Sequence, residues 1–159
     1  MSTRDLILVR HAHAQNAASG QGDLERTLSA TGIAEADAAG LWLKQHGAAP
    51  DRVLCSTAQR AQATCERLVA ALGCPRATED ARIYEATPAT LLRLIDEHTE
   101  ARCLLLVGHN PGLESLVALL SEGASDAGRG MPPGAVAWLS LPQGELEPAT
   151  ARVRHFWWP

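Results

Sequence analysis

The feature that most constrains the fold is the alternation of short apolar runs with helix-like segments along the 159-residue chain. Strand-like runs at 5–10, 52–56 and 101–107 are each followed by a segment in which apolar residues have helical spacing. This alternation is typical of a parallel sheet with helices on its faces. Two further strand-like runs, at 135–141 and 151–158, close the chain. We expect an α/β fold with three layers (α/β/α), a mostly parallel central sheet and helices on both faces.

Helix ends are marked by capping residues. Ser29 is a good cap for a helix that Gly47 and Pro50 end, and Thr87 with Pro88 is typical of a first helical turn. The apolar face of the first helix is expected to include Ile33, Ala36, Ala39, Leu41 and Leu43, and that of the Thr87 helix Leu91, Leu92, Leu94 and Ile95. Further helices are expected at 57–72 and from 112 to 120, and the Gly-, Ser- and Pro-rich segment 121–134 is expected to be a loop.

Composition excludes several classes of partner. Hydrophobic residues make up 46% of the chain and charged residues 20%, which is typical of a globular protein. With 14 basic and 18 acidic residues the net charge is −4, so a surface for nucleic acid is not expected. The apolar runs are too short to cross a bilayer, and the run at 6–9 ends at Arg10, unlike a signal peptide. We expect no membrane partner.

Cysteine usage indicates the compartment. The four cysteines follow no CxxC pattern and no regular spacing, which favours free thiols in a reducing cytoplasm. The length suits one hydrophobic core, and no linker or repeat interrupts it. We therefore expect a single cytoplasmic domain over residues 1–159, while the oligomeric state stays open.

Charged and polar groups follow three of the expected strands. The first strand ends in Arg10 and His11, the second leads into a helix whose first turn carries Arg60, and the strand at 101–107 is followed by His109. Ligand sites in such folds lie beyond the carboxyl ends of the strands. Arginine presents a planar fork of donors to phosphate oxygens, and histidine can attack phosphorus as a nucleophile. The pattern predicts an anion pocket that contains a nucleophile.

A metal site is the alternative for the His11-x-His13 pair. Barrel hydrolases that place such a pair after their first strand need roughly 250 residues, and no further cluster has the spacing of metal ligands. We expect no metal and no cofactor, with His13 at the pocket rim or exposed. Any one of these arginines or histidines, taken alone, is more typical of a solvated or hydrogen-bonded surface group.

Several segments, in order along the chain, resemble the histidine phosphatase superfamily, the phosphoglycerate mutase-like enzymes. The matching segments are Leu8-Val9-Arg10-His11, Arg26-Thr27-Leu28-Ser29 with Gly32, Cys55 to Thr64, Ile83-Tyr84-Glu85-Ala86, Val107-Gly108-His109-Asn110-Pro111-Gly112 and Met131 to Val136. The last three and the Arg26 element are similar to the short SixA-type phosphohistidine phosphatases, whereas Cys55 to Thr64 resembles the second phosphate-arginine motif of the superfamily. The likeness extends from residue 6 to about 141.

The resemblance implies roles for individual residues. His11 would be the nucleophile, Arg10, Arg60 and His109 would hold the phosphoryl oxygens, and Arg26 would be a further phosphate or substrate contact. Glu85 stands where larger relatives carry an acidic proton donor, and it fits a surface carboxylate equally well.

Three positions depart from the family pattern. Ala12 follows the nucleophile where many members have glycine, and Thr27 replaces a proline. Pro133 replaces a threonine, which removes a hydroxyl and an N–H near the pocket. The backbone N–H groups of Gly134 or Ala135 are expected to substitute for them.

The implied function is a metal-independent phosphatase with a phosphohistidine intermediate, acting on phosphohistidine in a signalling protein such as a histidine-phosphotransfer domain. Larger members insert a helical subdomain between Arg60 and His109, but only 48 residues separate them here. We therefore expect an open pocket with walls from 12–28, 85–88 and 121–134, suited to a phosphorylated protein. The alternatives are a small-molecule phosphomonoesterase and a non-catalytic phosphate-binding protein.

Overall fold

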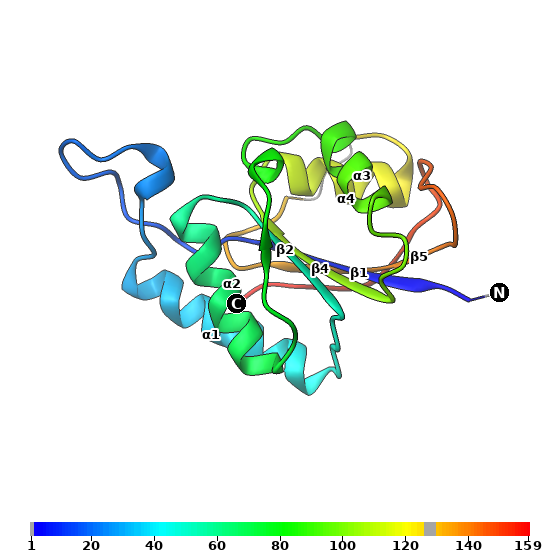
Figure 1. Ribbon diagram of the computed structural model, residues 1–159, viewed down its shortest axis with the longest axis horizontal. Coiled ribbons are helices and arrows are strands. Elements are labelled where there is room, and N and C mark those ends of the chain that lie inside the picture. The colour runs from blue at the N-terminus through cyan, green and yellow to red at the C-terminus, as the bar shows by residue number, and fades with distance from the viewer. Residues whose placement is uncertain (1, 126–129) are drawn as a thin grey trace.

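The computed structural model describes residues 2–125 and 130–159, and its centre is a six-stranded sheet in the order β3-β2-β4-β1-β5-β6 (Figure 1). The strands are β1 (Arg4–Arg10), β2 (Arg52–Cys55), β3 (Thr78–Glu79), β4 (Cys103–Gly108), β5 (Val136–Leu141) and β6 (Arg152–Trp157). β3, β2, β4 and β1 pair in parallel, whereas β5 is antiparallel to β1 and β6 is antiparallel to β5. The expectation of a mostly parallel sheet is confirmed.

Helices cover both faces of this sheet. α1 (Ala30–Gln45) and α2 (Gln59–Leu72) lie on one face, and α3 (Pro88–Asp96) and α4 (Gly112–Glu122) lie on the other (Figure 1). Two short 3-10 helices, η1 (Asp23–Glu25) and η2 (Ala81–Ile83), lie in the connections. The three-layer α/β/α arrangement is therefore as expected, and all four helices reach back to the strands through apolar side chains.

Strand β1 shows why the layers form. Its residues alternate between the faces, so Leu6 and Leu8 pack with the α3 and α4 side, while Ile7 and Val9 pack with the α1 and α2 side. All four side chains are fully buried. Each contributes roughly 2 kcal/mol of hydrophobic stabilisation, and β1 is consequently a firm base for the residues that follow it.

The expected apolar face of α1 is partly wrong. Ala36, Ala39 and Leu43 are buried, but Ile33 and Leu41 are 38% and 56% exposed. The reason is close packing against α2 through small residues, because a Cβ at Gly40 would lie 2.9 Å from the Cβ of Ala71. Because the two helices lie so close together, α1 presents its small residues to α2, and the side chains of Ile33 and Leu41 point toward solvent.

The remaining elements differ little from expectation. Ser29 and Thr87 cap α1 and α3, each accepting a backbone N–H bond with its side chain. Leu92 is only half-buried in α3, and the two-residue edge strand β3 has too short a pattern to be predicted. α4 continues to Glu122, into the segment expected as loop, and residues 126–129 of that segment lie outside the described part of the chain.

Two further features bear on the expected surroundings. All four cysteines are free thiols. Among the helices of the described residues, none has both the length and the apolar character needed to cross a membrane.

Candidate active site

The carboxyl ends of β1, β2 and β4 meet at one edge of the sheet and bring the predicted residues together. A hollow of about 600 Å³ opens there. It is lined by Arg10, His11, Asp23, Arg26, Arg60, Tyr84, Glu85, Ala86, Thr87, Pro88, His109, Asn110, Pro111, Gly112 and Ser115. Six of the eight predicted site residues therefore share one pocket, although they come from five separate segments of the chain.

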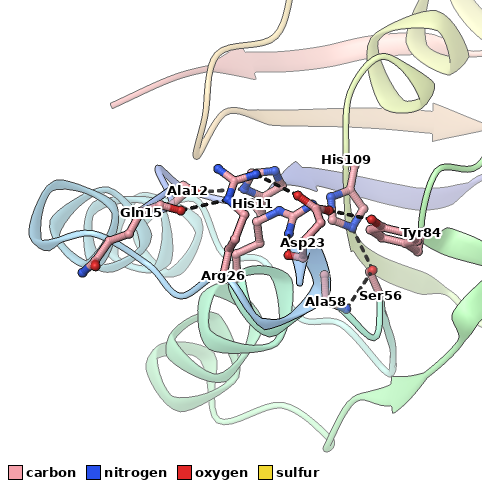
Figure 2. Close-up of polar contacts among 10 residues, drawn as sticks. His11, Ala12, Gln15, Asp23, Arg26, Ser56, Ala58, Tyr84 and His109 are labelled. Carbon is pink, nitrogen blue, oxygen red and sulfur yellow. Dashed lines mark hydrogen bonds and ion pairs between the residues drawn. The ribbon is translucent and has the colours of Figure 1, made fainter. Parts of the chain in front are cut away.

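His11 is held in one tautomer by the backbone of the next residue. Its Nδ1 lies 2.8 Å from the carbonyl oxygen of Ala12 (Figure 2). A carbonyl only accepts, so Nδ1 carries the proton and Nε2 carries the lone pair. Burial, with Arg60 and Arg10 nearby, lowers the pKa of His11 to about 4. The ring is therefore neutral near pH 7 and available as a nucleophile.

His109 is fixed beside His11 by contacts on several sides. Its Nε2 lies 2.8 Å from the Ser56 hydroxyl, and its ring centroid lies 5.0 Å from that of His11 and 5.5 Å from that of Tyr84. Burial, with His11 and Arg60 nearby, lowers the pKa of His109 to about 3. His109 is therefore a neutral hydrogen-bonding group in the free protein.

The arginines differ in how they are held. Arg60 lies in the first turn of α2 and is 6% exposed, whereas Arg10 and Arg26 are half-buried. Arg10 donates from Nη1 to the Met131 carbonyl at 2.9 Å. Arg26 donates from Nε to the Gln15 carbonyl at 2.8 Å. Three guanidinium groups around one hollow create the positive potential that a phosphoryl group requires.

Asp23 and Tyr84 complete this cluster, and sequence reasoning did not predict a role for either. The Asp23 carboxylate accepts from Arg26 Nη1 at 3.0 Å, from Arg60 Nη2 at 2.9 Å and from the Tyr84 hydroxyl at 2.5 Å (Figure 2). The Tyr84 hydroxyl and the two arginines hold the pKa of Asp23 well below its usual range. A lone Asp three positions before Arg26 carries no periodic signal, so only its nearness to that element could have suggested it.

Glu85 lies at the rim of the hollow, with an exposed side chain and a φ of 55°. A non-glycine residue in this left-handed region costs of order 1 kcal/mol and is typical of functional sites. Next to it, α4 begins unusually close to the rim, because a Cβ at Gly112 would lie 2.4 Å from the Ala86 carbonyl oxygen. Glycine at 112 therefore permits the contact that places the rim segment over the pocket.

Gly134 and Ala135 do not take the place expected of them. The Gly134 N–H donates to the carbonyls of Arg10 at 3.1 Å and His11 at 3.3 Å, and the Ala135 N–H donates to Pro132 at 3.0 Å. Both residues are buried where the segment before β5 turns onto the end of β1. Their N–H groups are used inside the fold, so the expectation that they replace the donors lost at Pro133 is not supported by this geometry.

One expected wall also differs. Residues 23 and 26 and residues 85–88 line the hollow as expected, but the described part of 121–134 does not. Gly130, Met131 and Pro132 instead line a neighbouring hollow of about 390 Å³, with Phe156 and Trp158. Arg10 and Asn110 border both hollows. Both side chains donate to the Met131 carbonyl, which therefore links them.

His13 points away from this chemistry. Its Nδ1 lies 2.7 Å from Glu35 Oε2, and its side chain is 54% exposed. Within the described residues, no three His, Cys, Asp or Glu side chains gather as a metal site would require.

Comparison with known proteins identifies the family. The histidine phosphatase superfamily (branch 1) matches residues 6–90, more than half of the chain. An uncharacterised protein of Mycobacterium tuberculosis (strain H37Rv) is 38% identical over 118 residues, which are 72% of this chain and 73% of that protein.

Solved structures agree with this match. A protein assigned as phosphohistidine phosphatase SixA from Agrobacterium tumefaciens has a TM-score of 0.84 at 29% identity, covering 98% of this chain and 99% of its own. Its counterpart from Nakamurella multipartitia has a TM-score of 0.83 at 28% identity, covering 100% and 98%. A protein histidine phosphatase SixA complexed with tungstate shares the fold, with a TM-score of 0.84 at 23% identity over 97% and 96%. This chain belongs to the histidine phosphatase superfamily, in its SixA-type branch, and is a phosphatase with a phosphoglycerate mutase-like α/β fold.

Proposed function

We propose that the protein hydrolyses phosphohistidine on a protein substrate, with His11 as the nucleophile that carries the phosphoryl group between two steps. The observation that carries this proposal is the His11 ring, neutral, with its Nδ1 proton bound to Ala12 and with Arg10, Arg60 and His109 around the same hollow. Phosphoryl transfer requires in-line positioning and stabilised oxygens more than covalent help from the protein.

In the first step, His11 Nε2 attacks phosphorus and the P–N bond of the substrate breaks. The electron pair of that bond stays on the ring nitrogen of the substrate. Because the substrate ring already carries a proton on its other nitrogen, it departs as a neutral imidazole. Arg10, Arg60 and His109 hold the equatorial oxygens, and Arg26 is a further contact at the mouth. Because the leaving group needs no added proton, Glu85 is dispensable for this substrate.

In the second step, the oxygen of a water molecule joins phosphorus and the bond to His11 Nε2 breaks. Both hydrogens of that water leave with inorganic phosphate, and His11 returns to its neutral form with the proton on Nδ1. The Ala12 carbonyl, which binds this proton at 2.8 Å, keeps the ring oriented through the cycle. Fixed arginine charges supply the electrostatic stabilisation here, so we expect activity to survive EDTA.

An open approach to the pocket favours a protein substrate. Residues 61–108, all within the described part, hold most of α2 and then β3, η2, α3 and β4, without the inserted subdomain of larger relatives. The neighbouring hollow adds an apolar surface, with Trp158 56% exposed. A protein that presents a phosphorylated histidine can contact both hollows, whereas a small metabolite fills only the first.

A small-molecule phosphomonoesterase is the second candidate, and Glu85 is the observation that favours it. Its carboxylate lies at the rim on strained backbone, where it could protonate an alkoxide leaving group. An ester would need that proton, unlike phosphohistidine.

Direct competition between the two substrate classes tests the proposal. We would measure kcat/KM for a phosphorylated histidine-phosphotransfer domain and for a panel of phosphorylated metabolites in one buffer, with His11→Ala as blank. We expect the phosphoprotein to be preferred. Trp158→Ala should lower kcat/KM for the phosphoprotein and leave it unchanged for a small phosphoramidate, while Leu41→Ala, equally exposed at 56%, should change neither. A metabolite that outperforms every phosphoprotein would contradict the assignment. The cytoplasmic location stays a prediction.

A further inference from the structure

Asp23 holds Arg60 with two different groups of one residue. Its backbone carbonyl accepts from Arg60 Nη1 at 2.7 Å, and its carboxylate accepts from Arg60 Nη2 at 2.9 Å. These two contacts fix the plane of the guanidinium as well as its position. We propose that Asp23 is a positioning residue, which orients Arg60 for the phosphoryl oxygens. The inference rests on the proposed phosphatase function of this pocket.

The donor inventory of Arg60 supports this role. A guanidinium has five N–H bonds, of which each Nη carries two. Asp23 takes one from each Nη, and Nε is buried without a partner among the described residues. One N–H on each Nη therefore remains for a substrate oxygen. A buried arginine that is gripped along one edge presents its other donors in a fixed direction, which is what transition-state stabilisation requires.

Asp23 is itself held by two other residues of the pocket. Arg26 Nη1 donates to Oδ1, and the Tyr84 hydroxyl donates to Oδ2, the same oxygen that binds Arg60. The three donors come from three segments. Arg26 lies in the connection before α1, Arg60 lies in α2, and Tyr84 follows η2. Figure 2 shows Asp23 between Arg26 and Tyr84. Asp23 thus ties the 12–28 connection to Arg60 across the pocket.

The opposite role, an internal anion that competes with substrate for the arginines, fits the geometry less well. The Asp23 side chain is 47% exposed, whereas that of Arg60 is 7% exposed, so the carboxylate lies on the solvent side of the guanidinium that it binds. One carboxylate against Arg26 and Arg60 also leaves positive charge in excess. The two roles predict opposite signs, because removal of a competing charge would strengthen oxyanion binding.

The test measures oxyanion binding and turnover separately. Calorimetry with tungstate or inorganic phosphate gives the Kd, and a small phosphoramidate gives kcat and KM, for the full chain and its variants. We expect Asp23→Asn to raise the oxyanion Kd about tenfold and to lower kcat, and Asp23→Glu to restore part of both. Asp37→Asn is the matched control, because Asp37 also accepts two bonds from an arginine, Arg67, on the exposed surface. It should change neither quantity.

Tyr84→Phe gives an independent reading, since it removes only the hydroxyl that holds Asp23. It should weaken oxyanion binding less than Asp23→Asn, and the double variant should match Asp23→Asn alone because both changes act through Arg60. Unchanged or tighter binding by Asp23→Asn, with weaker binding by Arg60→Ala, would overturn the inference alone. Unchanged binding by Arg60→Ala would instead overturn the proposed function of the pocket.

Discussion

Two arginine–carboxylate clusters in this molecule have similar bond lengths and opposite charge balance. Around Asp23, one carboxylate meets two arginines. Around Arg82, one guanidinium meets two carboxylates, Asp80 and Glu97, at 2.7–3.0 Å. The first cluster keeps positive charge in excess, whereas the second has more carboxylate than arginine.

Burial separates the two clusters further. The side chain of Arg60 is 7% exposed and that of Arg82 is 46% exposed. Exposed ion pairs contribute about 0–1 kcal/mol because solvent screens them, whereas a buried cation without full pairing attracts an anion strongly. Contact distance alone therefore does not identify a functional arginine. An excess of positive charge and the burial of the guanidinium do identify it.

The largest expected effect tests the nucleophile at the centre of the first cluster. His11→Ala should abolish turnover, by roughly 10³-fold or more, and leave the fold intact because the side chain lies at a strand end. Acid-labile, base-stable labelling of the wild-type protein by labelled substrate should disappear in the variant. His13→Ala, two residues along and paired with Glu35, is the control. Normal turnover by His11→Ala would refute the assignment.

Loss of the buried guanidinium should have the next largest effect. Arg60→Ala should lower kcat/KM by on the order of 10²-fold, about 3 kcal/mol, because it removes charge that stabilises the transition state. Arg67→Ala, on the same helix, loses only the exposed pair with Asp37 and should stay within about twofold. Similar losses in both variants would show that the buried surplus of charge has no special role.

Acid pH should destabilise the site through its histidines. Their pKa values in the folded protein, about 4 for His11 and about 3 for His109, lie below the ordinary value of 6.5. The unfolded chain therefore takes up protons first, and stability falls as pH drops from about 6.5 toward 4 through His11 and toward 3 through His109. The slope is at most about 1.4 kcal/mol per pH unit for each histidine.

Denaturation in urea at a series of pH values checks this window, and NMR titration of the ring protons locates the midpoints. His109→Gln should flatten the dependence of stability on pH. A His109 midpoint near 6.5 would contradict the effect of burial beside His11 and Arg60.

A carboxylate at the rim should matter less than either arginine. Glu85→Gln should reduce kcat/KM for a phosphoramidate by less than about tenfold, since the leaving imidazole needs little acid assistance. Glu85→Gly should be stabilised, by about 1 kcal/mol, because glycine adopts a φ of 55° without strain. Thermal unfolding and kinetics of both variants separate the two effects. A loss as large as that of Arg60→Ala would favour an ester substrate.

These effects bear on how far the sequence could predict the site. Arg10 ends β1, His11 and His109 directly follow β1 and β4, and Arg60 lies in the first turn of the helix after β2, so strand order alone brings them to one edge. Asp23 could not be placed this way, because it lies in a connection whose path depends on side-chain contacts.

The errors have similar physical causes. Whether the N–H groups of Gly134 and Ala135 face a ligand depends on the turn before β5, and that turn directs them to backbone carbonyls. The α1 face was mispredicted because helix contact through Gly40 favours small side chains over large ones. In both places the outcome depends on close packing between segments, which periodicity in one segment does not encode.

The smallest expected effect is at the exposed cluster around Arg82. It tests whether that cluster, unlike the one around Asp23, has no part in activity. Arg82→Ala removes bonds to both Asp80 and Glu97, yet each partner returns to solvent at little cost. We expect little change in unfolding free energy, because solvent screens exposed pairs, and no change in kcat/KM. Urea denaturation and turnover of a small phosphoramidate check both. Because Arg82 lies two residues before Tyr84, unchanged turnover would also show that this segment tolerates a local change of charge. A marked loss of activity would mean that the ion pairs of Arg82 affect the Asp23 cluster through η2. The two clusters would then not be independent.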